Sequence, residues 1–80
     1  MTDKEAALAA CDSAEKDRLA RLAGVFMDEY AAAEGKPNAE ALRQASGERF
    51  QAGMKVLAAA HAAAEGLVGR VFPLGAAAGG

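Results

Sequence analysis

His61 and Glu65 come nearest, by residue type and spacing, to a reactive site in this 80-residue chain. Four residues apart on a helix, an imidazole and a carboxylate lie on one face and can hold a metal ion together. A helical di-iron centre, however, needs Glu-x-x-His on paired helices, and the residue three before His61 is Ala58. We therefore expect His61 to form a hydrogen bond with a facing helix, and we predict neither a metal ligand nor a bound cofactor.

Cys11 is the second candidate, because a thiolate can act as a nucleophile. No base lies near it in the sequence, and it falls on an apolar helix face, so we interpret it as a thiol packed among hydrophobic side chains. The run Gly66-Leu67-Val68-Gly69 lacks the glycine spacing and the Lys-Ser/Thr of a phosphate-binding loop. The sequence thus predicts no catalytic residue; a redox or metal enzyme using Cys11, His61 and Glu65 is the competing hypothesis.

The composition favours helices and limits the partners. Ala, the residue with the highest helix propensity, supplies 23 of the 80 residues, and β-branched residues are few. We expect an all-α fold with almost no strand. The net charge is −2 with both signs scattered, which argues against a basic nucleic-acid-binding face.

The chain carries no feature of a targeting or membrane segment. Its first residues are too acidic for a signal peptide, and charged residues such as Lys55 and Arg70 interrupt the hydrophobic stretch 52–72. A single Cys allows no internal disulfide, which is typical of a reducing compartment. We expect a cytoplasmic protein, or one incorporated in a particle assembled there.

Local signals predict a first helix over 3–34. Thr2 and Glu5 have the spacing of a capping box, and no Pro follows before Pro37. We expect Asp12–Lys16 and Asp17–Arg21 to form ion pairs on the solvent face. The apolar face of this helix comprises Leu8, Cys11, Leu19, Leu22, Phe26, Tyr30 and Ala33.

A turn over 35–38 separates this helix from a second one over 39–71. Gly35 suits a left-handed position after a helix end, Pro37 stops the helix, and Asn38 is a good N-cap. A kink is possible near Ser46-Gly47, and Gly66 could end the helix early. The Gly/Ala-rich tail 73–80 completes a single domain spanning 1–80, which we expect to be an antiparallel hairpin of two long amphipathic helices.

The second helix carries an apolar stripe longer than one hairpin interface can cover. Large side chains are few, and some flank the apolar faces, such as Val25 on the first helix and Val56 on the second. We therefore expect oligomerisation or a partner to complete the fold. The residues expected to bind that partner are Phe50, Met54, Leu57, Leu67, Val68 and Phe72.

From Gly35 onward the chain resembles a known family in its Gly/Pro turn followed by spaced apolar residues. The residues that carry the likeness are Gly35, Pro37, Leu42, Gln44, Phe50, Gly53, Met54, Val56 and Leu57. This pattern is similar to that of the small hairpin co-chaperones of type III secretion needle subunits, over roughly residues 28–60. The resemblance implies a non-catalytic hairpin that packs against a helical-repeat chaperone and helps keep a needle subunit monomeric in the cytoplasm.

The sequence therefore predicts a non-enzymatic subunit that packs an amphipathic hairpin into a larger protein complex. Two other hypotheses remain open: a small structural protein of a phage or virus-like particle, and a protein that binds a lipid or granule surface.

Overall fold

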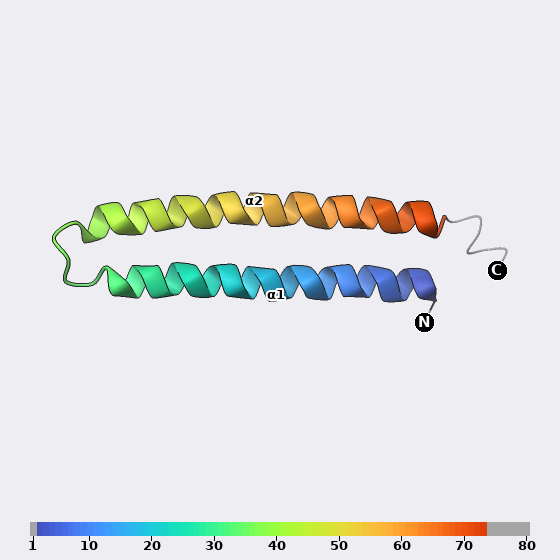
Figure 1. The fold of residues 1–80 in the computed structure, drawn as a ribbon, viewed down its shortest axis with the longest axis horizontal. Coiled ribbons are helices and arrows are strands. Elements are labelled where there is room, and N and C mark those ends of the chain that lie inside the picture. The colour runs from blue at the N-terminus through green and yellow to red at the C-terminus, as the bar shows by residue number, and fades with distance from the viewer. Residues whose placement is uncertain (1, 74–80) are drawn as a thin grey trace.

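The computed structural model describes residues 2–73, and over that range the chain forms two helices and no strand. Helix α1 spans Asp3–Ala32 and helix α2 spans Ala39–Val71. The helices lie side by side and antiparallel, so that α1 begins at the end of the molecule where α2 finishes (Figure 1). The predicted all-α hairpin is confirmed. The predicted tail lies almost entirely outside the described residues.

The N-terminus of α1 is capped by the residues that the sequence indicated. The Thr2 hydroxyl oxygen accepts a hydrogen bond of 3.1 Å from the backbone N–H of Glu5. That hydroxyl also donates to the Glu5 carboxylate, at 3.1 Å, whereas a full capping box would send the carboxylate to the Thr2 backbone. Capping satisfies one of the free amides at the helix start.

The turn begins two residues earlier than predicted, because α1 ends at Ala32. The amides of Glu34 and Lys36 bond to carbonyls three residues back, which closes tight turns before the helix could extend to residue 34. Gly35 has φ of +80°, the left-handed value for which glycine was expected. The prediction for Asn38 is wrong in part: it precedes α2, but its side chain forms no capping hydrogen bond.

Helix α2 runs unbroken through Ser46-Gly47 and Gly66 to Val71, so the kink expected near residue 46 is absent. The reason lies in contacts with the other helix. Ser46 is fully buried, and its hydroxyl donates to the Glu29 carboxylate of α1 at 2.7 Å. A serine that binds across the interface does not compete for its own backbone, so the helix continues.

Close packing in the middle of the hairpin depends on one glycine. A Cβ placed on Gly53 would lie 2.7 Å from Leu22 Cδ2, whereas the missing side chain lets α1 approach α2. Towards the turn, the rings of Phe26 and Phe50 stack with their centroids 5.1 Å apart. These contacts join the apolar faces that the sequence predicted.

The molecule is a slab one helix deep, with extents of 64 × 18 × 10 Å. Within residues 2–73, only Ala33 and Ser46 are fully buried. A two-helix layer therefore has no enclosed core, and its larger apolar side chains keep part of their surface in water. Neither helix is both long and apolar enough to cross a membrane.

Candidate functional site

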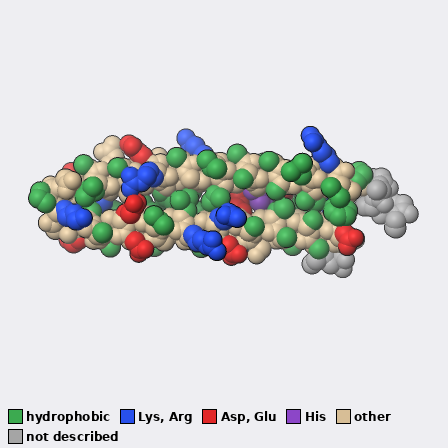
Figure 2. All heavy atoms as spheres, viewed as in Figure 1, with side chains coloured by type: hydrophobic (Ala, Val, Ile, Leu, Met, Phe, Trp, Pro, Cys, Tyr) green, Lys and Arg blue, Asp and Glu red, His purple; other side chains and the backbone are tan. Residues whose placement is uncertain are grey.

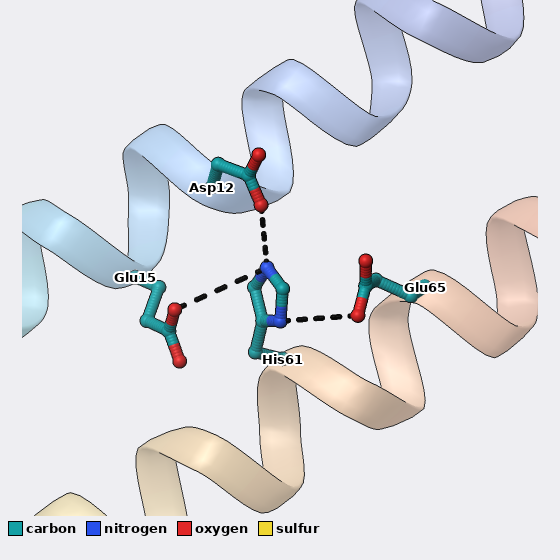
Figure 3. A network of polar contacts seen from close by, with 4 residues as sticks. All are labelled: Asp12, Glu15, His61 and Glu65. Atoms are coloured by element: carbon teal, nitrogen blue, oxygen red, sulfur yellow. Dashed lines mark hydrogen bonds and ion pairs between the residues drawn. The ribbon is translucent and has the colours of Figure 1, made fainter.

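Four ionisable side chains meet between the helices around His61. Asp12 and Glu15 extend from α1, and Glu65 lies one turn beyond His61 on α2 (Figure 3). His61 Nε2 is 2.7 Å from Asp12 Oδ1 and 4.0 Å from Glu15 Oε1, and Nδ1 is 3.3 Å from Glu65 Oε1. The imidazole is largely covered, with 18% of its side chain exposed. We call these four residues the His61 cluster.

The His61 cluster favours the protonated imidazole. Both ring nitrogens face carboxylates, and only the imidazolium can donate from both. The hydrogen bond with Asp12 raises the pKa of His61 above its ordinary value, and the carboxylates of Glu15 and Glu65 act in the same direction. Partial burial opposes this shift. The ring therefore binds a proton more tightly in the hairpin than in the unfolded chain.

The His61 cluster also contains groups that could bind a metal ion. Ligand atoms of Asp12, His61 and Glu65 all lie within 4.8 Å of one another, a grouping that spans both helices. However, the two carboxylates lie at opposite nitrogens of the ring, and a single ion can coordinate only one of those nitrogens. The geometry suits two hydrogen bonds better than one metal.

The contact of Asp12 with the facing helix contradicts a prediction made from local spacing. The expected ion pair with Lys16 is not formed, because Asp12 contacts His61 on the facing helix instead. The expected Asp17–Arg21 pair is likewise missing from the ion pairs of residues 2–73. Counting outward from the middle of the predicted turn 35–38 places Asp12 and His61 at equal distances, so the sequence did contain the signal.

A second polar group lies nearer the turn. Glu29 accepts from Ser46 Oγ at 2.7 Å and from Arg49 Nη2 at 3.0 Å. The hydrogen bond from Ser46, followed by that from Arg49, holds the pKa of the Glu29 carboxyl below its usual range. Together with the His61 cluster, this contact fixes the register of the two helices at two separate points.

One side of the hairpin carries a continuous shallow groove between the helices. Adjoining hollows share Arg18, Leu22 and Leu57 along its length. We call this side the open face and define it by residues at the groove and beside it. They are Ala10, Ala14, Arg18, Arg21 and Val25 of α1 and Gly53, Val56, Ala60, Ala64 and Leu67 of α2.

The open face is apolar and well exposed. Val25 is 55% exposed, Val56 67% and Leu67 58%. Figure 2 shows hydrophobic side chains along both helices, with Lys and Arg side chains projecting near the middle of the molecule. An uncovered apolar strip bordered by charged groups is typical of an interaction surface.

The six residues predicted to bind a partner divide between two environments. Phe50 stacks on Phe26, and Leu57 lines the groove between the helices. Val68 and Phe72 are partly buried. Met54 and Leu67 keep more of their surface exposed, and Leu67 belongs to the open face. The helical period thus identified the apolar stripe but did not separate the residues that pack inside the hairpin from those left accessible.

The arginines at the groove and Cys11 compare differently with the sequence prediction. Arg18 and Arg21 border the groove, but Arg18 was not singled out and Arg21 was expected only to pair with Asp17 on the solvent face. Cys11 is half-buried and lines the same hollow as His61, in agreement with a packed thiol.

Comparison with known protein families, curated proteins and solved structures finds no match to this chain.

Proposed function

We propose that this chain is a non-enzymatic interaction subunit that packs the open face of its hairpin against helices in a larger protein assembly. The observation that carries the proposal is the exposure of Val25, Val56 and Leu67. Val25 and Val56 line one hollow of the groove, and Leu67 lies one turn beyond Ala64, which lines the next. The hairpin itself encloses no large side chain among its described residues, so further burial requires another molecule.

The magnitude of the hydrophobic effect supports this proposal. Burial of one Val or Leu side chain contributes about 1.5–3 kcal/mol relative to leaving it in water. The burial free energy of three such residues together is comparable to the whole unfolding free energy of a small domain. A partner that covers the open face would therefore decide how firmly the hairpin folds.

The arrangement of His61 supports a non-catalytic role. A general base must offer a free lone pair to its substrate within hydrogen-bond reach. Both nitrogens of His61 are already directed at Asp12 and Glu65, which leaves neither available. The His61 cluster is better suited to hold α1 against α2.

The resemblance to needle-subunit co-chaperones gives the proposal a possible setting. In that setting the partner is a helical-repeat chaperone and the complex forms in the cytoplasm. The Gly35–Pro37 turn and the apolar residues that follow it are the features shared with that family.

Affinity capture from the source cells, with the full chain as bait, tests the proposal. The captured protein is identified by mass spectrometry, purified and titrated against the chain by calorimetry. We expect Val56→Asp to abolish binding, because it puts a charge into the apolar contact. Met27→Asp should leave binding unchanged, since Met27 is equally exposed at 65% but lines no part of the groove. Equal binding by both variants would overturn the assignment of the open face.

A further inference from the structure

The half of the hairpin next to the turn is joined by several independent contacts. This turn half comprises residues 19–54, and the remaining terminal half comprises residues 3–18 of α1 and 55–71 of α2. In the turn half, Phe26 stacks on Phe50 with the ring centroids 5.1 Å apart. Side chains of α2 also donate hydrogen bonds to α1 there, from Arg43, Ser46 and Arg49. Loss of any one of these contacts leaves the others in place.

In the terminal half, by contrast, the polar contacts between the helices all involve His61. Among the described residues of this half, it alone bridges α1 and α2 by a hydrogen bond or ion pair, with Asp12 at 2.7 Å and Glu15 at 4.0 Å. No residue of this half is fully buried, whereas Ala33 and Ser46 of the turn half are.

Packing around His61 is provided mainly by small side chains. The hollow beside it is lined by Ala10, Cys11, Ala14, Ala60 and Ala64, with Leu57 at its inner end. Alanine side chains bury little apolar surface, whereas aromatic rings such as those stacked in the turn half bury much more. Cohesion of the terminal half therefore depends strongly on the His61 cluster.

We infer that the His61 cluster controls the opening of the terminal half. When the imidazolium loses its proton, the ends of α1 and α2 separate while the turn half stays closed. Opening requires no second molecule, so it occurs whether or not the open face binds a partner.

The positions of the carboxylates explain why the proton matters. The imidazolium donates from Nε2 towards Asp12 and from Nδ1 towards Glu65, whose Oε1 is 3.3 Å away. A neutral ring has one N–H and one lone pair, so one of these two carboxylates then faces an acceptor. In the tautomer protonated at Nδ1, the hydrogen bond that is lost is the one across the interface.

Loss of the proton also leaves uncompensated negative charge between the helices. Asp12 and Glu15 approach from α1 and Glu65 lies on α2, so three carboxylates surround the neutral ring (Figure 3). Like charges repel each other across the interface. Arg18 lines the same hollow but forms no ion pair within residues 2–73. The same carboxylates raise the pKa of His61 above 6.5, so opening increases as the pH rises above that value.

Cys11 provides a probe of opening in the unmodified chain. It is the one cysteine, is half-buried and lines the hollow beside His61. Its rate of alkylation by iodoacetamide is measured in the folded chain and divided by the rate in the chain unfolded in urea at the same pH. The ratio corrects for the higher reactivity of the thiolate at higher pH. We expect it to rise about fivefold above pH 6.5, the effect of losing one net hydrogen bond.

Two variants separate local opening from unfolding of the whole hairpin. Cys11→Ala combined with Ala45→Cys moves the thiol to a half-buried position of the turn half, where the ratio should rise far less. His61→Gln keeps a donor for Asp12 but does not titrate, so the ratio for Cys11 should not change with pH.

Three outcomes would overturn local opening under the control of His61. A rise of the same size at both thiol positions would show that the hairpin unfolds as a whole. A constant ratio at Cys11 would show that the helices stay closed, and a rise that persists in His61→Gln would show that another group is responsible.

Amide hydrogen exchange of the unmodified chain makes the same comparison without any substitution. Exchange rates are corrected for the intrinsic rate at each pH. Above pH 6.5, protection should fall in residues 57–65 and be retained in residues 42–50. An equal loss of protection in the two segments would contradict the opening of the terminal half alone.

Discussion

His61 couples the stability of the hairpin to pH. Its pKa is raised in the folded state, chiefly by the hydrogen bond with Asp12. The contribution is therefore fully present below the ordinary pKa of 6.5 and is lost as the pH rises through the folded-state pKa. We expect the urea midpoint, followed by circular dichroism, to fall as the pH rises above 6.5.

A His61→Gln variant provides the control for this pH dependence. The amide N–H of Gln can still donate one hydrogen bond to the Asp12 carboxylate, but Gln does not titrate. The fall in stability above pH 6.5 that His61 causes should vanish in this variant, because the imidazole is gone. An unchanged slope would show that another group causes the effect.

Glu29 produces the opposite dependence at acid pH. Its pKa is lowered, first by the hydrogen bond from Ser46 and then by that from Arg49. Its contribution is present above the ordinary pKa of 4.5 and is lost as the pH falls through the folded-state pKa. We expect Ser46→Ala to reduce the loss of stability on acidification, as measured by urea midpoints between about pH 2 and 5.

Arg43 joins the end of α1 to α2 through three contacts, which we expect to contribute unequally to the unfolding free energy. Its Nε donates to the Tyr30 carbonyl at 3.1 Å, its guanidinium lies 4.0 Å from the Tyr30 ring centroid, and Nη2 is 2.8 Å from Glu34 Oε2. Because α1 has no basic residue in its last turn, Arg43 places a cation at the negative end of its dipole.

We expect Arg43→Ala to cost about 1–2 kcal/mol of unfolding free energy, from the lost hydrogen bond and cation–π contact. Glu34→Gln should cost under about 0.5 kcal/mol, since the Glu34 side chain is 81% exposed and such ion pairs are weak. Urea unfolding of the two variants compares them. A larger loss for Glu34→Gln would show that the ion pair dominates.

At the scale of the helices, two glycines offer a matched comparison. Gly→Ala inside a helix stabilises by roughly 1 kcal/mol through propensity alone. Nothing lies within 4 Å of a Cβ at Gly24, whereas one at Gly53 would meet Leu22 at 2.7 Å. We expect Gly24→Ala to raise the unfolding free energy by about 0.5–1 kcal/mol, and Gly53→Ala to lose that gain because Leu22 must move.

Chemical denaturation of both variants checks the comparison. The gain in helix propensity is the same for both substitutions, so the difference between their unfolding free energies reports the contact with Leu22. Equal stabilisation by the two substitutions would mean that the helices separate easily at Gly53. Such a result would also weaken the close approach on which the groove of the open face depends.

Local chemistry was sufficient to predict the elements of this fold. Thr2 at the helix start and Gly35 in the turn each act within a few residues, so the sequence alone indicates them. Ser46-Gly47 misled the prediction, because the hydroxyl that could disturb its own helix is bound by Glu29 across the interface. Contacts of that kind depend on the register of the hairpin and not on neighbouring residues.

At the candidate site, too, local patterns predicted some features, whereas contacts between the helices decided others. Periodicity located the apolar stripe that contains Phe50 and Leu57, and it placed His61 at the facing helix. Local spacing assigned Asp12 to Lys16, whereas the register counted outward from the turn, which was not used, places it opposite His61.

At the scale of the whole molecule, the slab shape governs folding. A layer 10 Å deep leaves both broad sides in contact with water. Polar contacts at the His61 cluster and at Glu29 fix how α1 and α2 align, but exposed charge pairs contribute little net stability. If the chain associates as we propose, burial of the apolar surface that one hairpin leaves uncovered adds to its stability.

Thermal melting should therefore depend on protein concentration. If folding and association occur together, the melting temperature rises with concentration by mass action. We expect a rise over a hundredfold range from micromolar concentrations upward, followed by circular dichroism at 222 nm. Val56→Asp should melt at a lower temperature with a flatter dependence, because the apolar contact no longer adds to folding, whereas Met27→Asp should follow the unmodified chain. A sharp transition at one temperature, with monomer mass throughout, would show that two helices suffice and that the open face contributes nothing to folding.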